Sequence, residues 1–224
     1  MRAMKEVGLS VIEWGSDVHC PPEKAGEIAA LQAQYGITCS SYGTYFRLGE
    51  TPMEQLPDYI AAAKTLGTTI LRLWCGNKDS GIYTDEEKIT LFSLCKTAAE
   101  IAEKSGVVLC MECHVNTYTN TKESALALMQ AVNSPNFKMY WQPIQYVSEA
   151  ENLAYARLLA PYTVHLHVFN WKMTERYPLA QAADIWKQYL SFFKPDSTLL
   201  LEFMPDDNIE TLCREAQALK ELAK

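Results

Sequence analysis

Two glutamates end strongly apolar runs, and they are the residues of this sequence best suited to chemistry. Glu112 follows the run VVLCM, and Glu202 follows three consecutive leucines. Burying a lone carboxylate is costly, so each needs a metal ion, a cation or hydrogen bonds nearby. Two carboxylates on opposite sides of a sugar carbon could remove a proton from one face and return it to the other. A salt-bridged rim without chemistry is the alternative interpretation.

Histidines and other polar residues end the neighbouring apolar runs in the same way. Side chains alternate along a strand, so Glu112 shares a face with His114, and His165 shares one with His167. Two carboxylates and a histidine that meet at one place match the ligands of a divalent metal ion. The polar residues that end the apolar runs are Glu13, Tyr42, Arg72, Glu112 with His114, Gln142, His167 and Glu202.

The elements that must position these residues alternate regularly along the chain. Short apolar runs predict seven strands, at 9–14, 37–42, 69–74, 107–114, 137–142, 164–169 and 198–203. Helical periodicity predicts helices at 23–34, 53–66, 85–105, 122–132, 149–159, 180–193 and 208–223. Glycines 36, 67 and 106 each stand just before a strand, where a helix-ending glycine belongs. Strict alternation implies parallel strands joined by right-handed crossovers.

Two α/β architectures fit this alternation, an open doubly wound sheet and a (β/α)8 TIM barrel. The sequence has no GxGxxG or GxxxxGK[ST] motif, which argues against a nucleotide-binding sheet. Polar residues at every strand end favour a barrel mouth. We therefore predict one barrel domain over residues 1–224. Only seven strands are expected, so the first strand and most of the first helix of an eight-stranded barrel are absent, and MRAMKEV is the end of that helix. This N-terminal truncation predicts a gap between the first and last strands present.

Composition excludes several classes of function. The chain has 224 residues and a formal net charge of -7, so an acidic surface would repel nucleic acid. No stretch approaches 18 uninterrupted apolar residues, so we expect no membrane span, and the N-terminus lacks the apolar region of a secretory signal. Seven cysteines, an odd number scattered through strand-like and helix-like stretches, predict free thiols in a reducing cytoplasm.

Several segments resemble a known family. The stretches IEWGSDVHCPP, SSYGTYFRLG, LRLWCG, MECHVNTYTNTKESALALMQAV, MYWQP, HLHVFNW and LLLEF are similar to bacterial sugar phosphate isomerase/epimerase proteins. Those proteins belong to the xylose isomerase-like TIM-barrel superfamily. The resemblance covers residues 8–207. The superfamily includes ketose epimerases, hydroxypyruvate isomerase, inosose dehydratase and endonuclease IV, so membership does not fix a substrate.

The resemblance implies a divalent-metal site, with Mn, Mg, Zn or Co as the ion. Its ligands would be Glu112, Gln142, His167 and Glu202, and the two glutamates would also be the catalytic acid and base. Gln142 departs from the family pattern, which has an aspartate there. A glutamine oxygen can ligate, but it is neutral and stabilises a divalent ion less than a carboxylate does.

Further residues near the strand ends are candidates for substrate binding. Glu13 and His19 could hydrogen-bond to sugar hydroxyls, although Glu13 could instead pair with Arg72. Trp74 and Trp141 could stack on the apolar face of a sugar ring. A basic pair after the run 164–169, Lys172 and Arg176, could hold a phosphate or carboxylate of the substrate. The full set of substrate-binding candidates is Glu13, His19, Tyr42, Arg72, Trp74, His114, Trp141, Asn170, Lys172 and Arg176, with Tyr45 beside Tyr42 as a weaker one.

The expected function is a metal-assisted isomerase or epimerase of a sugar or sugar phosphate. Glu112 and Glu202 would move a proton through an enediolate while the metal polarises the carbonyl. A dehydratase of a keto-polyol uses the same parts and stays open, as does a catalytically impaired barrel that only binds sugar. A nuclease is disfavoured by four histidines in total and by the negative charge. The expected partners are a small sugar and, as barrels of this type often dimerise, a second copy of the chain.

Overall fold

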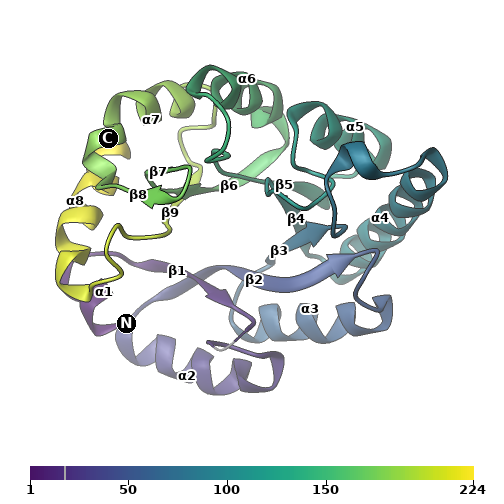
Figure 1. Ribbon diagram of the computed structural model, residues 1–224. Coiled ribbons are helices and arrows are strands. Elements are labelled where there is room, and N and C mark those ends of the chain that lie inside the picture. Colours follow the sequence, from purple (N-terminus) through teal and green to yellow (C-terminus); the bar gives the residue numbers. More distant parts are fainter. Residues whose placement is uncertain (18) are drawn as a thin grey trace.

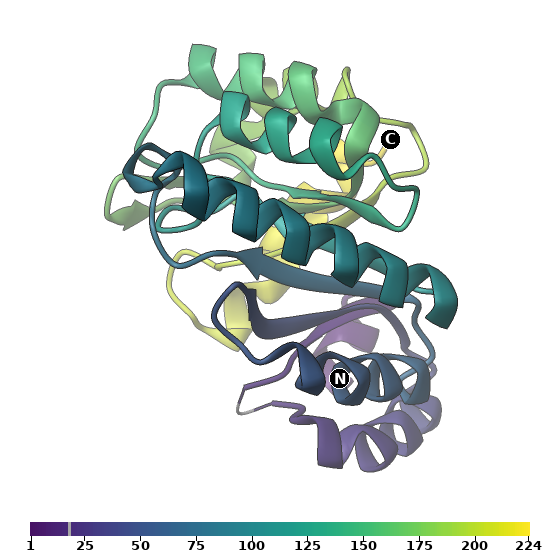
Figure 2. The same ribbon diagram turned by 90° about the vertical axis from the view of Figure 1, so that its right-hand side faces the viewer.

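A computed structural model describes residues 1–17 and 19–224. Seven parallel strands form one curved sheet in the order β1-β2-β3-β4-β5-β6-β9, and the helices lie outside it (Figure 1). A view turned by 90° shows the same layering, with the helices packed along the outer surface (Figure 2). The sheet strands are β1 Val11–Gly15, β2 Thr38–Leu48, β3 Ile70–Cys75, β4 Val108–Glu112, β5 Phe137–Trp141, β6 Thr163–Val168 and β9 Thr198–Leu201. The expected α/β TIM-barrel class with seven strands is confirmed.

Eight helices accompany these strands in the described part of the chain. They are α1 Arg2–Glu6, α2 Ala25–Tyr35, α3 Leu56–Thr65, α4 Asp85–Ser105, α5 Lys122–Val132, α6 Glu149–Leu159, α7 Ala183–Leu190 and α8 Leu212–Leu222. Short 3-10 turns lie at Pro22–Lys24, Met53–Gln55, Ser80–Ile82, Ala160–Tyr162, Leu179–Ala182 and Ile209–Thr211. The sequence did not predict the small antiparallel hairpin of β7 Trp171–Lys172 and β8 Glu175–Arg176, which stands beside the barrel mouth.

Local signals in the sequence explain where helix α4 begins and ends. Thr84 accepts a hydrogen bond from the Glu87 backbone N–H, and the Glu87 carboxylate accepts one from the Thr84 N–H. This reciprocal pair satisfies backbone donors that the helix leaves free. Gly106 ends the helix with φ of 66°, a left-handed conformation that glycine adopts without cost. The chain therefore turns directly into β4, which carries Glu112.

The main core lies between the strands and the helices. Trp141 is fully buried there, against Trp186, Tyr189 and Phe193. A second, smaller cluster of Cys110, Tyr140 and Leu200 fills the barrel interior beneath the mouth. Adjacent residues such as Tyr140 and Trp141 therefore serve opposite faces of one strand, as strand alternation requires.

The barrel has a seam between β1 and β9, which are not hydrogen-bonded neighbours in the described sheet. A cavity of about 540 Å³ lies along it and is lined by apolar residues such as Leu9 and Val11 and also by the polar residues Glu13, Arg72 and Glu202. All five residues of β1 remain partly exposed, whereas the strands opposite are mostly buried. The seven-stranded sheet is thus nearly closed, with its gap at the predicted place.

The cysteines and the helices test two expectations from the sequence, free thiols and the lack of a membrane span. All seven cysteines are free thiols, and six of them are buried, the exception being Cys213. No helix in the described ranges is long and apolar enough to cross a membrane.

Candidate functional site

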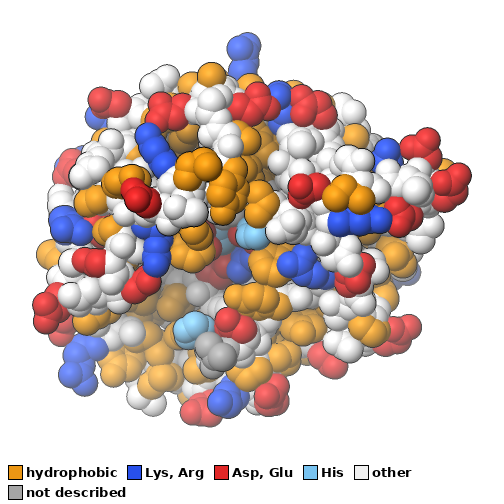
Figure 3. All heavy atoms as spheres, viewed as in Figure 1, with side chains coloured by type: hydrophobic (Ala, Val, Ile, Leu, Met, Phe, Trp, Pro, Cys, Tyr) orange, Lys and Arg blue, Asp and Glu red, His pale blue; other side chains and the backbone are white. Residues whose placement is uncertain are grey.

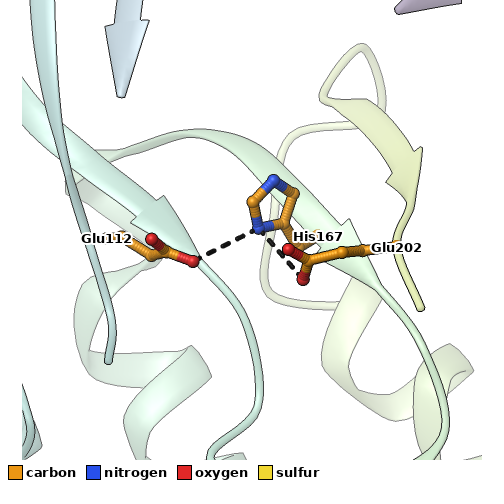
Figure 4. A group of neighbouring side chains, drawn as sticks. All are labelled: Glu112, His167 and Glu202. Carbon is orange, nitrogen blue, oxygen red and sulfur yellow. Dashed lines mark ion pairs between the residues drawn. The ribbon is translucent and has the colours of Figure 1, made fainter. Parts of the chain in front are cut away.

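Four neighbouring strands bring four polar side chains together at the barrel mouth. Glu112 is the last residue of β4, Gln142 follows β5, His167 lies in β6 and Glu202 follows β9. His167 Nδ1 lies 2.9 Å from Gln142 Oε1, 3.3 Å from Glu202 Oε2 and 3.6 Å from Glu112 Oε1. Figure 4 shows the imidazole between the two carboxylates. These are the four residues that the resemblance implies as metal ligands.

The four residues fit a divalent metal ion. One ligand atom each from Glu112, His167 and Glu202 lies within 4.8 Å of the others. Glu202 Oε2 is buried and, among the described residues, accepts no hydrogen bond. A buried carboxylate oxygen without a hydrogen bond is costly, and a cation would remove that cost. Carboxylate and amide oxygens with one imidazole nitrogen suit Mg, Mn, Zn or Co.

Glu13 approaches His167 from the opposite side of the ring. Its Oε1 lies 3.3 Å from His167 Nε2, and the same oxygen accepts a hydrogen bond from Arg72 Nε at 2.8 Å. Its Oε2 accepts a hydrogen bond from the Ser41 hydroxyl at 2.8 Å. A carboxylate on the far nitrogen of a ligating histidine fixes the tautomer and the ring orientation. Glu13 therefore leaves Nδ1 facing Gln142, Glu112 and Glu202.

Arg72 and Trp74 fix the direction of the Glu112 carboxylate. Arg72 Nη1 donates to Glu112 Oε2 at 2.5 Å, and the indole N–H of Trp74 donates to the same oxygen. Both donors come from β3, which pairs with β4. One Glu112 oxygen is thus held by the neighbouring strand, and the other faces His167. Arg72 also bridges Glu112 to Glu13, so these three side chains form a buried ion-pair network at the mouth.

The same contacts give the two catalytic candidates different acidities. Burial opposes ionisation of Glu112, but the charges of Arg72 and His167 prevail and lower its pKa to about 2. Burial raises the pKa of Glu202 to about 7, against the opposing effect of His167. For His167, burial disfavours the charged ring, but the carboxylates of Glu202 and Glu13 raise its pKa to about 10. One ionised and one protonatable carboxyl group are the pair that proton transfer requires.

An aromatic wall of three side chains stands on one side of the mouth. The rings of Trp74 and His114 have centroids 5.2 Å apart, and Tyr45 meets Trp74 edge-on at 5.3 Å. The Arg47 guanidinium covers the other part of Trp74, 4.0 Å from the ring centroid. His114 Nδ1 donates to the carbonyl of Val115 at 2.6 Å, which fixes its ring. Such a surface can pack against the C–H face of a sugar. Figure 3 shows the hollow at this face of the molecule.

The structure does not bring Tyr42 and Trp141 into the site, which corrects the expectation that they contact substrate. Trp141 faces the helices, because its neighbour Tyr140 takes the interior direction. The Tyr42 hydroxyl donates to the carbonyl of Cys20 at 2.6 Å, and the side chain is fully buried. The pairing of β1 with β2 shifts register between Ile12 and Glu13, so that Glu13 pairs with Ser41.

The expected anion-binding residues after β6 are engaged elsewhere. Lys172 Nζ pairs with Glu149 at 2.8 Å, and Arg176 makes a two-pronged pair with Asp207 at 2.6 and 2.7 Å. Asn170 donates to the carbonyl of Pro178. His19 is exposed at the cavity rim and lies 3.2 Å from Asp17. None of these four contacts involves the residues around His167.

Two contributors to the site were missed in the sequence. Ser41 donates to Glu13, and its hydroxyl lies 3.2 Å from that of Tyr140. The Tyr140 ring lies under His167, with centroids 4.5 Å apart. Alternation along β5 could have pointed to Tyr140, because it precedes Trp141 on the other face. Ser41 depends on the register shift and left no signal in the sequence.

A parallel barrel that gathers carboxylate, amide and imidazole groups at the carboxyl ends of its strands defines the class of protein. The chain belongs to the xylose isomerase-like TIM barrel family, which matches residues 1–177. A curated relative, a 3-dehydroshikimate dehydratase of Bacillus anthracis, is 23% identical over 155 residues. That match covers 69% of this chain and 53% of the relative, so the chain spans about half the length of the curated relative.

Solved structures share the fold at low sequence identity. The probable 3-DHS dehydratase AsbF of Bacillus anthracis superposes with a TM-score of 0.79 at 18% identity, over 98% of this chain and 91% of that one. An L-ribulose 3-epimerase gives 0.74 at 15% identity, over 99% and 86%. The IOLI protein with a bound zinc atom gives 0.73 at 16% identity, over 99% and 89%. The fold thus includes epimerases, dehydratases and metal-containing proteins.

Proposed function

We propose that this protein is a divalent-metal-dependent isomerase or epimerase of a small sugar or sugar phosphate. The observation that carries the proposal is that Glu112 and Glu202 both face His167 Nδ1, at 3.6 and 3.3 Å, one ionised and one able to hold a proton near neutral pH. Such a pair can take a proton from carbon on one side and supply one from the other. The similarity in fold to an L-ribulose 3-epimerase supports the same reaction class.

A bound divalent ion would polarise the substrate carbonyl and acidify the adjacent C–H bond. The residues of the chain would do the rest. One glutamate removes the proton from that carbon, the C–H electron pair forms a C=C bond, and the π pair of the carbonyl moves to its oxygen to give an enediolate. The other glutamate delivers a proton to the opposite face of the carbon, which inverts it.

Three neighbours keep this pair in place. Arg72 and Trp74 hold one oxygen of Glu112, so its free oxygen stays directed into the mouth. Glu13 contacts Nε2 of His167 and so orients the ring as a neutral ligand whose Nδ1 faces the mouth. The aromatic wall of Tyr45, Trp74 and His114 is placed to exclude water from one side of the sugar. Positioning of this kind contributes to rate because the reacting groups need no rearrangement.

The second candidate is a keto-polyol dehydratase, which the similarity to 3-dehydroshikimate dehydratases favours. The first step is the same removal of a proton next to a carbonyl. The electron pair then expels a hydroxyl group from the next carbon as water, with the proton supplied by the other glutamate. The product is an unsaturated ketone that absorbs in the ultraviolet, whereas an epimerised ketose does not, so one spectrum separates the two reactions.

The test uses the purified chain loaded with Mn²⁺ and a panel of ketopentoses and ketohexoses, with products separated by chromatography. We expect new ketose isomers from the wild type, and a loss of about 100-fold or more in both Glu112→Gln and Glu202→Gln. Glu123→Gln is the matched control, because Glu123 pairs with Lys122 on the outer helix α5. A wild type that binds Mn²⁺ and ketose without turnover would overturn the proposal in favour of a sugar-binding barrel.

A further inference from the structure

Carboxylate partners already engage the basic residues that the sequence suggests as substrate ligands. These are Arg72 with Glu13 and Glu112, Lys172 with Glu149, and Arg176 with Asp207. Arg47 differs from them, because it forms no ion pair within residues 1–17 and 19–224. Its one side-chain hydrogen bond in those ranges runs from Nη1 to the carbonyl of Gly76 at 3.0 Å. The Nε and Nη2 donors of Arg47 therefore have no acceptor in the described part of the chain.

A bulge in strand β2 aims Arg47 at the mouth. Gly43 pairs with Arg72 and Arg47 pairs with Trp74, so β2 takes more residues than β3 to cover the same length of the sheet. The Thr44 hydroxyl donates to the carbonyl of Arg72 at 2.8 Å and anchors the bulge on the neighbouring strand. Bulges redirect side chains and are frequent beside active sites. The position of Arg47 is therefore set by the sheet itself, and not by a loose surface loop.

Trp74 connects Arg47 to the groups proposed to react. The Arg47 guanidinium lies 4.0 Å from the centroid of the Trp74 ring, a stacking contact that fixes its plane. The indole N–H of Trp74 donates to Glu112, whose other oxygen faces His167. Arg47 therefore stands one indole ring away from a catalytic candidate. The chain of a ketopentose or ketohexose can span that distance, so a substrate whose reacting carbon lies beside Glu112 reaches Arg47 with its far end.

The positive charge of Arg47 has no carboxylate in contact with it. Glu50 and Glu112 are the acidic groups that act on it most, but neither forms an ion pair with it, and Glu112 already holds Arg72. A half-buried cation without a partner is costly, and a bound anion would remove that cost. The open edge of the guanidinium presents the Nε and Nη2 N–H groups side by side, which is the geometry that holds a carboxylate or a phosphate most firmly.

We propose that Arg47 is a specificity-determining residue of this site, which binds an anionic group at the end of the substrate away from the reacting carbon. A carboxylate and a phosphate share the chemistry that this edge recognises, two oxygens that accept parallel N–H donors. The inference rests on the proposed function and narrows it, because an uncharged ketose would leave the donors of Arg47 unmatched. Arg47 thus takes the role that the sequence suggests for Lys172 and Arg176.

The experiment compares ketohexoses that differ only in the group on the terminal carbon: D-fructose, its terminal phosphate ester and its terminal carboxylate, D-fructuronate. Deuterium uptake from D2O on the Mg²⁺-loaded protein gives kcat/KM for each compound. We expect the wild type to prefer one of the two anions over D-fructose by about tenfold or more, and the preferred anion distinguishes carboxylate from phosphate. Arg47→Met should remove this preference through KM, since the contact is remote from the reacting carbon. Arg47→Lys keeps the charge without the fork and should retain part of it. Arg157→Met, at an exposed site on α6, is the matched control and should keep the preference.

The outcomes separate this inference from the proposed function. If D-fructose exchanges as well as both anions, or if Arg47→Met keeps the preference, the inference is overturned and the proton-transfer function stands. If no compound exchanges, calorimetric titration of the same ketohexoses into the Mg²⁺-loaded wild type and Arg47→Met decides. We then expect one anion to bind the wild type about tenfold or more tighter than D-fructose, and this difference to vanish in the variant. Equal affinities in the wild type, or no binding of any of these compounds, would refute the role of Arg47.

Discussion

Glu13 makes the sharpest prediction, because it is not itself a proposed ligand and reaches the proposed ligands only through His167 and Arg72. The perturbation is Glu13→Gln, which keeps the shape of the side chain and removes its charge. The carboxylate now meets His167 Nε2 at 3.3 Å, Arg72 Nε at 2.8 Å and the Ser41 hydroxyl at 2.8 Å. An amide oxygen in the place of Oε1 can still accept from Arg72 and His167, but it is neutral, so it holds the tautomer of the histidine less firmly than the carboxylate does.

The expected size follows from these contacts. Loss of a carboxylate behind a ligating histidine typically lowers metal affinity about 10- to 100-fold, which corresponds to ~1.4 to ~2.7 kcal/mol. Folding should be affected less than by an orphaned buried charge, which costs ~3–5 kcal/mol, because Arg72 keeps its pair with Glu112. We therefore expect a protein that folds and binds metal weakly.

Calorimetric titration with Zn²⁺ measures the affinity, and urea unfolding of the metal-free protein measures stability. Asp17→Asn is the matched control, since Asp17 lies two residues beyond β1 and contacts His19 without contacting His167. Wild-type metal affinity in a correctly folded Glu13→Gln would refute the view that Glu13 orients a ligating histidine. Equal losses in both variants would mean that the charge of the rim matters and the specific contact does not.

Three other predictions follow from neighbouring features. Gln142→Glu places a charge where the structure has a neutral oxygen 2.9 Å from His167 Nδ1, so metal affinity in the same titration should rise about tenfold or more; a fall would remove Gln142 from the ligand set. Trp141→Ala should cost ~3–5 kcal/mol of unfolding free energy because Trp141 is buried among aromatic rings, while metal affinity stays unchanged; the converse pattern would return Trp141 to the site. A thiol reagent at pH 8 should label Cys213 alone in the folded protein, because the other cysteines are buried and burial raises the pKa of Cys39 and Cys113 to about 12; rapid labelling of a second thiol, read by mass spectrometry, would contradict the packing.

The sequence predicts the ring of strands and the place of Glu112 and Glu202 at strand ends, for a physical reason. Buried parallel strands need apolar runs, so a polar residue at the end of such a run stands out, as Glu112 and Glu202 do. Helices α4, α5 and α6 begin and end at the expected residues because caps such as Thr84 and Gly106 are local signals.

What the sequence could not predict depends on pairing between segments far apart in the chain. The register shift between β1 and β2 decides that Ser41, and not Tyr42, meets Glu13. The pairing of Arg176 with Asp207 joins residues 31 positions apart, and neither local composition nor periodicity carries that information. For this reason the sequence suggests Arg176 as a ligand of a substrate anion, whereas the structure pairs it with Asp207.

The central claim is that Glu112 and Glu202 exchange a proton with carbon at a metal-loaded mouth. The most direct measurement is deuterium uptake from D2O into the recovered ketose and its isomer, for the wild type and Glu202→Gln at equal metal occupancy. The account predicts uptake at the single carbon beside the carbonyl in the wild type, and a loss of about 100-fold or more in the variant. Isomer formation without deuterium uptake, or undiminished uptake in Glu202→Gln, would contradict it.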